Sequence, residues 1–382
     1  MKKERGIVPE NRVGLDRPSV QFLVLAGLSV VIAASFYFLD FLGALEKTDF
    51  DLPYYTLQLQ DLILHRQTAL TWPLFRVFVP TLSIGASQLL GISFRHAMQL
   101  LSVLFMVLLV CFIYYVNRHR LKSAFYISTF FMTFPVIMLY AGTYFIELPF
   151  MALLFASLWF WDRYLHTGSK KDLWLTVLFS VLGLLTKEAF LVGYVIMGAY
   201  AVLFFGSKRK ALLVGYAPLG LFLLALAYFN YEYLFGFVKP LVLSPITTNT
   251  ITTNFHAIGL REAVSFFLKL KGGFIHVLLN ILLTFGMTHA LVCFFWRRER
   301  PSVRTAMAVY FGLLYALLIF IAMNVAASQR YVMLCFAPSY LLFISKKVPE
   351  YIHDRRLPAF CSAHVVVNLL LTIAYVIYQN RQ

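Results

Sequence analysis

The sequence predicts an all-α polytopic membrane protein, and three observations support this fold class. Hydrophobic residues make up 60% of the 382 residues and charged residues only 13%, whereas soluble domains are about half apolar and a quarter charged. The apolar residues fall in runs that suit helices crossing a hydrocarbon core of about 30 Å. The alternation typical of membrane β-strands is absent, and helices satisfy their own backbone hydrogen bonds within the bilayer.

Apolar runs predict about eleven membrane-spanning helices in a single integral membrane domain, residues 1–382. The spans are expected at about 20–39, 97–116, 123–140, 147–161, 173–186, 189–205, 211–229, 273–296, 305–323, 331–344 and 358–378. Residues 1–19 then form an N-terminal segment on the inner side. Two long segments, residues 40–96 and 230–272, lie on the outer side.

Lysine and arginine residues gather on alternate loops of this arrangement. With a cytoplasmic N-terminus, 22 of the 33 basic residues fall in the short inner segments. Cytoplasmic loops of membrane proteins collect such residues, so we expect the N-terminus inside and the C-terminus outside a bacterial inner membrane. The same bias accounts for the net charge of +16, and we therefore expect membrane lipids as partners and no nucleic acid.

Both long outer segments contain amphipathic stretches. Apolar and polar residues are interleaved from Leu57 to Arg66, and the apolar run from Trp72 to Leu90 is broken by Pro73 and Pro80. A further amphipathic stretch runs from 260 to 271 in the second segment. Helices that lie in the membrane interface suit these patterns better than further spans.

Two acids stand one residue apart in the first outer segment. Asp49 and Asp51 precede an apolar, aromatic stretch that contains Tyr55. Carboxylates held close together at a membrane surface suit a general base, because mutual repulsion and burial favour uptake of a proton. An ordinary solvated loop is the alternative.

Further charged residues stand at the outer ends of apolar runs. Glu147 opens the fourth span, Lys187 and Glu188 occupy the turn after the fifth, and Arg330-Tyr331 opens the tenth. Charges at this depth are costly unless paired, which makes them functional candidates. Pairing of Lys187 with Glu188, a helix-dipole contact by Glu147 and interface anchoring by Arg330 are the alternatives. Together, these charges suit a lipid-linked phosphate leaving group.

Several short motifs of the chain resemble those of glycosyltransferases with the C-type (GT-C) membrane fold, which include protein O-mannosyltransferases and lipid A aminoarabinose transferases. The likeness covers about residues 20–345, and its motifs follow the family order: Asp51-Leu52-Pro53-Tyr54-Tyr55, Thr71-Trp72-Pro73-Leu74-Phe75, Gln88 to Ser93, Tyr140 to Glu147, Gly183-Leu184-Leu185-Thr186-Lys187, and Arg330-Tyr331 with Pro338. Leu52 stands where the family has Glu, and Trp72 where it has the first Pro of its Pro-Pro-Leu stretch.

The resemblance implies a GT-C-like fold that transfers a sugar from a polyprenyl-phosphate donor, with inversion, at the outer membrane face. The acceptor would be a glycan, a lipid or a protein. Asp51 would be the base, and Asp49 or Glu147 would orient the acceptor. The resemblance implies no fixed cofactor, although some members hold a divalent metal at such an acid.

The resemblance also implies groups that bind the substrates. The leaving phosphate would contact Lys187, Arg330 and Tyr331, with Lys269 and Lys271 as helpers. The acceptor or donor pocket would include Tyr55, His65 and Arg66.

Two rival functions remain open at the level of sequence. A transporter or lipid flippase would place polar groups near the bilayer midplane, whereas the charges of this chain fall in predicted loops and helix ends. A non-catalytic membrane scaffold with the same fold is the second rival, and Leu52 at the family's Glu position favours it.

Overall fold

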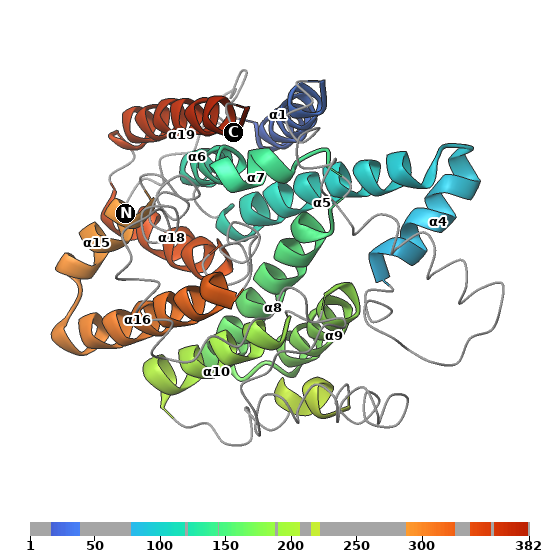
Figure 1. Ribbon diagram of the computed structural model, residues 1–382. Helices are drawn as coiled ribbons and strands as arrows, with labels where there is room; N and C mark the ends of the chain where they lie inside the picture. Colours follow the sequence, from blue (N-terminus) through green and yellow to red (C-terminus); the bar gives the residue numbers. More distant parts are fainter. Residues whose placement is uncertain are drawn as a thin grey trace, which may run out of the picture.

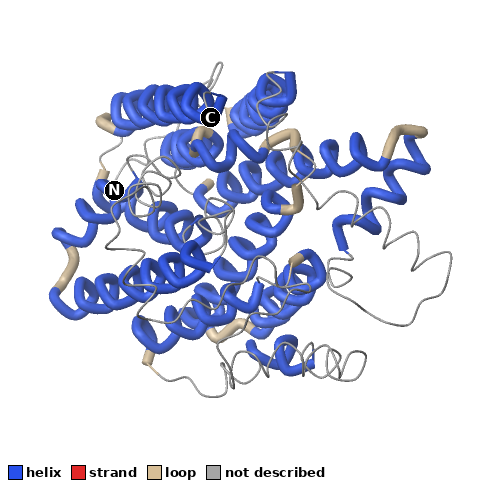
Figure 2. Tube along the Cα trace, in the orientation of Figure 1, coloured by secondary structure: helices blue, strands red, loops and turns tan. Residues whose placement is uncertain are grey.

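The computed structural model describes residues 17–38, 78–118, 121–143, 145–187, 190–206, 215–221, 288–324, 337–352 and 355–380. Within these ranges every regular element is a helix, and no strand occurs (Figure 2). The predicted all-α class is therefore confirmed for this part of the chain.

The helices match the predicted apolar runs closely. Their bounds are α1 Pro18–Phe38, α4 Phe78–Leu90, α5 Phe94–Asn117, α6 Leu121–Met132, α7 Pro135–Tyr140, α8 Glu147–Thr167, α9 Lys170–Thr186, α10 Phe190–Phe205, α15 Thr288–Arg298, α16 Pro301–Asn324, α18 Ala337–Tyr351 and α19 Leu357–Asn380. Residues 215–221 are also helical. Each predicted span thus overlaps a helix, with ends that differ by a few residues in most cases.

Three of the described helices are long and apolar enough to cross a membrane. These stretches are Pro18–Ser35, Phe94–Asn117 and Leu357–Ala374. They agree with an α-helical membrane protein, because a helix needs about 20 predominantly apolar residues to cross the hydrocarbon core. The number of eleven spans and the orientation stay predictions.

The third predicted span, 123–140, is not one continuous helix. α6 ends at Met132, and α7 begins at Pro135. Phe134, between them, has φ −60° and ψ 130°. Proline disfavours the helical conformation of the residue before it and has no backbone N–H to donate. The helix is therefore interrupted at Phe134, and α7 begins with Pro135 in its first turn.

α4 and α8 illustrate the two kinds of helix environment. α4 projects from the far end of α5 at one edge of the molecule (Figure 1), and its 13 residues are too few to cross a bilayer. The interfacial position predicted for this stretch is not tested. α8 instead lies in the middle and packs against α5, α9, α10 and α18, so most of its residues are buried.

Contacts between helices join ends that the loop charges assign to the same side. The Tyr114 hydroxyl near the end of α5 donates to Gln21 Oε1 at the start of α1, at 2.9 Å. Tyr351 at the end of α18 donates to Glu299 Oε1 after α15, at 3.1 Å. Helices that alternate in direction and are joined by short loops bring such ends to the same side, and these two contacts agree with that arrangement.

We predict that Thr167→Cys and Gln88→Cys, each in a chain without other cysteines, react with a membrane-impermeant thiol reagent from opposite sides. Both side chains are exposed, and the loop charges place Thr167 inside and Gln88 outside. Labelling in intact cells and in inverted vesicles measures this, and labelling of both positions from one side would contradict the topology.

Candidate functional site

Glu147 and Lys187 form a buried ion pair. Lys187 Nζ donates to Glu147 Oε1 at 2.8 Å, although the two residues are 40 positions apart. The Glu147 side chain is 0% exposed and that of Lys187 3%. A pair this deeply buried is retained only when the geometry is good, because desolvating the two charges is expensive.

The turn before α8 positions Glu147 as the first residue of that helix. Ser102 on α5 donates to the Tyr140 carbonyl at 3.1 Å, and Thr143 donates to the same carbonyl at 2.9 Å. Gly142 between them has φ 76°, a conformation that glycine adopts without steric cost. The helix N-terminus favours a negative side chain, which suits Glu147 at this position.

The end of α9 positions Lys187 opposite this carboxylate. α9 stops at Thr186, and Lys187 has extended backbone, with its N–H donating to the Gly183 carbonyl at 2.9 Å. The Lys187 carbonyl accepts from the Phe190 N–H at 2.9 Å, which begins α10. A Cβ atom on Gly183 would overlap the Phe190 ring, so a glycine is needed for this close approach of α10 to α9.

Buried apolar side chains of α8, α9 and α10 pack into one cluster near the pair. This apolar cluster consists of Phe150, Leu154, Leu184, Phe190 and Tyr194. Phe150 stands one turn after Glu147, and its ring meets that of Phe190 edge-on, with centroids 5.9 Å apart. Surroundings of this kind lower the local dielectric, which strengthens the attraction between the two charges.

Of the predicted site residues, the structure brings Glu147 and Lys187 together. The others lie outside the described residues: Asp49, Asp51, Tyr55, His65, Arg66, Lys269, Lys271, Arg330 and Tyr331. Glu188, the alternative partner of Lys187, also lies outside them. Within the described ranges, no three His, Cys, Asp or Glu side chains gather in a way that could hold a metal ion.

A second charged cluster lies near the opposite end of α8. The buried Asp162 pairs with Lys346 on α18 and accepts from the Tyr200 hydroxyl on α10 at 2.6 Å. Burial lowers the pKa of Lys346 from its ordinary value, and the charge and hydrogen bond of Asp162 offset part of that effect. The cluster therefore ties three helices together at the end that the loop charges assign to the cytoplasm.

This inner cluster was not predicted from the sequence, although a signal was present. Asp162 directly follows the apolar run that was predicted to span the membrane at 147–161. An acid at that position needs a partner, and the basic pair Lys346-Lys347 ends another apolar run on the same predicted side. The sequence contains no feature that selects Tyr200 as the third member.

Comparisons with known proteins add no family to these observations. No protein-family model matches this sequence, and no curated protein matches it.

We predict that Glu147→Gln and Lys187→Met each lower the free energy of unfolding by about 3–5 kcal/mol, because each removes one member of a buried ion pair. The double variant should lose less than the sum of the two, since the charges interact directly. Equilibrium unfolding in mixed detergent micelles gives the free energy of unfolding of the wild type, the two single variants and the double variant.

Glu350→Gln is the matched control for this comparison. Glu350 also pairs with a lysine, Lys347, at 2.9 Å, but its side chain is 51% exposed, and exposed pairs contribute about 0–1 kcal/mol. If Glu147→Gln were no more destabilising than this control, the buried pair would not form in the protein.

Proposed function

We propose that the chain is a glycosyltransferase that moves a sugar from a polyprenyl-phosphate donor to an acceptor at the outer membrane face. The observation that supports the proposal is the ion pair of Glu147 and Lys187. These residues stand at the outer ends of two predicted spans, and they belong to two separate motifs that resemble those of GT-C transferases. In the structure their side chains meet at the ends of α8 and α9.

The proposed reaction is a single displacement at the anomeric carbon. The acceptor oxygen attacks that carbon from the face opposite the phosphate, and the bond to the phosphate oxygen breaks with inversion. Asp51 takes the proton of the acceptor hydroxyl, and the polyprenyl phosphate leaves with the electron pair. Negative charge grows on the phosphate oxygen, so a fixed ammonium group close to it stabilises the transition state.

In this proposal Lys187 is the ammonium group and Glu147 is its positioning residue. An ammonium group has three N–H donors, so a bond to Glu147 is compatible with a bond to a phosphate oxygen. A lysine without a fixed partner would have to give up side-chain freedom when the donor binds. The pair with Glu147 removes that freedom in advance.

One observation favours the transporter alternative. His364 and Asn368 lie one turn apart inside the candidate span of α19, and both are 0% exposed. Among the described residues, their side-chain nitrogen and oxygen atoms have no hydrogen-bond partner. Polar groups buried within a span often mark a substrate or ion pathway, and this pair was not anticipated from the sequence.

The proposal is tested by measuring sugar transfer by the purified, reconstituted protein. The donors are a panel of polyprenyl-phosphate pentoses, hexoses and aminosugars. We predict that Asp51→Asn lowers kcat by about 10²–10⁴-fold, as expected for loss of a general base. Lys187→Met should lower kcat more than it raises KM, because part of the bond to phosphate strengthens only as the leaving group acquires charge.

Two controls separate the alternatives in this experiment. Lys171→Met removes an exposed cation from the other end of α9 and should leave transfer unchanged. The flippase would be favoured instead if a fluorescent polyprenyl phosphate moved between the leaflets of vesicles that contain the protein while no donor of the panel gave sugar transfer. Full turnover by Lys187→Met would remove this lysine from the reaction.

A further inference from the structure

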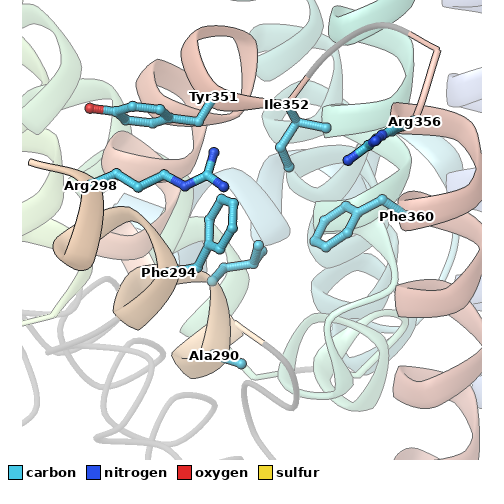
Figure 3. A pocket seen from close by; sticks show the side chains of 8 residues that line it. Ala290, Phe294, Arg298, Tyr351, Ile352, Arg356 and Phe360 are labelled. Atoms are coloured by element: carbon cyan, nitrogen blue, oxygen red, sulfur yellow. The ribbon is translucent and has the colours of Figure 1, made fainter.

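A pocket of about 360 Å³ opens between α15, the end of α18 and the start of α19. It lies at the predicted cytoplasmic end of these helices, away from Glu147 and Lys187. Its walls are largely apolar and include Leu291, Phe294, Ile352 and Phe360. Arg298 and Arg356 approach it from opposite sides, and both guanidinium groups point toward the space between these side chains (Figure 3).

Neither arginine is neutralised by an acid of the described chain. The carboxylates that the structure describes at this end pair with other cations: Glu299 and Glu350 with Lys347, Asp162 with Lys346, and Asp172 with Arg163. Arg298 instead lies over the Phe294 ring, 4.1 Å from its centroid. A guanidinium group on a ring still presents N–H donors at its edge, so the pocket combines two cations with an apolar floor.

The position of Arg356 relates the pocket to the membrane surface. Arg356 directly precedes α19, whose first 18 residues form a candidate span from Leu357. Arg298 is the last residue of α15. Basic residues at the end of a span lie at the depth of lipid headgroups. With the predicted topology, we therefore expect both guanidinium groups at the depth of the lipid phosphates of that leaflet.

We propose that this pocket binds the phosphate of an anionic lipid, with Arg298 and Arg356 on the phosphate and the start of an acyl chain along Phe294 and Phe360. Arginine suits this role, because its planar fork forms two parallel hydrogen bonds to phosphate oxygens. Basic pockets between helices on the cytoplasmic side are a recurrent form of headgroup recognition. The proposal is independent of the transferase reaction at the opposite face.

Thermal unfolding of the purified protein in an uncharged detergent tests the proposal, with short-chain phosphatidylglycerol as ligand. We predict a saturable rise in Tm, and a much smaller rise with phosphatidylcholine of the same chain length or with inorganic phosphate at the same concentration. Arg298→Gln and Arg356→Gln should each weaken binding by about tenfold or more in Kd, because each removes a charged group that hydrogen-bonds to the phosphate. Native mass spectrometry should show one fewer retained phosphatidylglycerol in the double variant.

Arg297→Gln is the matched control, because it removes the same charge from the same turn of α15 outside the pocket. Ala290→Trp retains both cations and fills the pocket, and it should also abolish the Tm rise. If the double arginine variant does not fold, Ala290→Trp still tests whether the lipid binds in this pocket. Equal effects of the two lipids, or of Arg297→Gln and the pocket variants, would overturn the proposal. An equal effect of inorganic phosphate would assign the site to free phosphate instead of a lipid.

Discussion

An ammonium group and a carboxylate that are both removed from solvent have to stay together, because either charge alone in that place costs several kcal/mol. Glu147 and Lys187 meet this condition, and the conformation of the chain around them follows from it. The Tyr140 turn is fixed to α5 by Ser102, and the end of α9 is fixed to α10 through Phe190. A shift of α8 along α9 would separate the charges. The pair therefore fixes how these two helices lie against each other.

The two ends of α8 carry different arrangements of charge. At the proposed outer end, the buried side chains of Glu147 and Lys187 pair at the start of α8 and the end of α9. At the opposite end, Asp162 links α8 to α10 and α18 by two partners, and the surrounding loops are basic. The first arrangement keeps one charged pair away from solvent. The second holds three helices together at the end that the loop charges assign to the cytoplasm.

How far the sequence predicts the structure depends on the range of the interactions. Apolar length predicts most of the described helices, because a span must satisfy its backbone within its own segment. The break at Pro135 is also local and could have been predicted from the proline alone. Glu147 and Lys187 were identified singly, yet nothing in the sequence indicates that they are partners, since the contact crosses 40 residues. The His364–Asn368 pair and the Arg298–Arg356 pocket depend on packing between distant helices and were missed for that reason.

Exchanging the two charges tests most directly whether the Glu147–Lys187 pair both holds the helices and serves the reaction. We predict that Glu147→Lys and Lys187→Glu are each strongly destabilising, and that the doubly exchanged protein recovers most of the stability, because the opposite charges meet again. Sugar transfer should not return, since a carboxylate would then stand where the phosphate needs an ammonium group. Unfolding and transfer measured on the same four proteins give the result. An exchanged protein as unstable as the single variants, or one with wild-type transfer, would contradict this role of the pair.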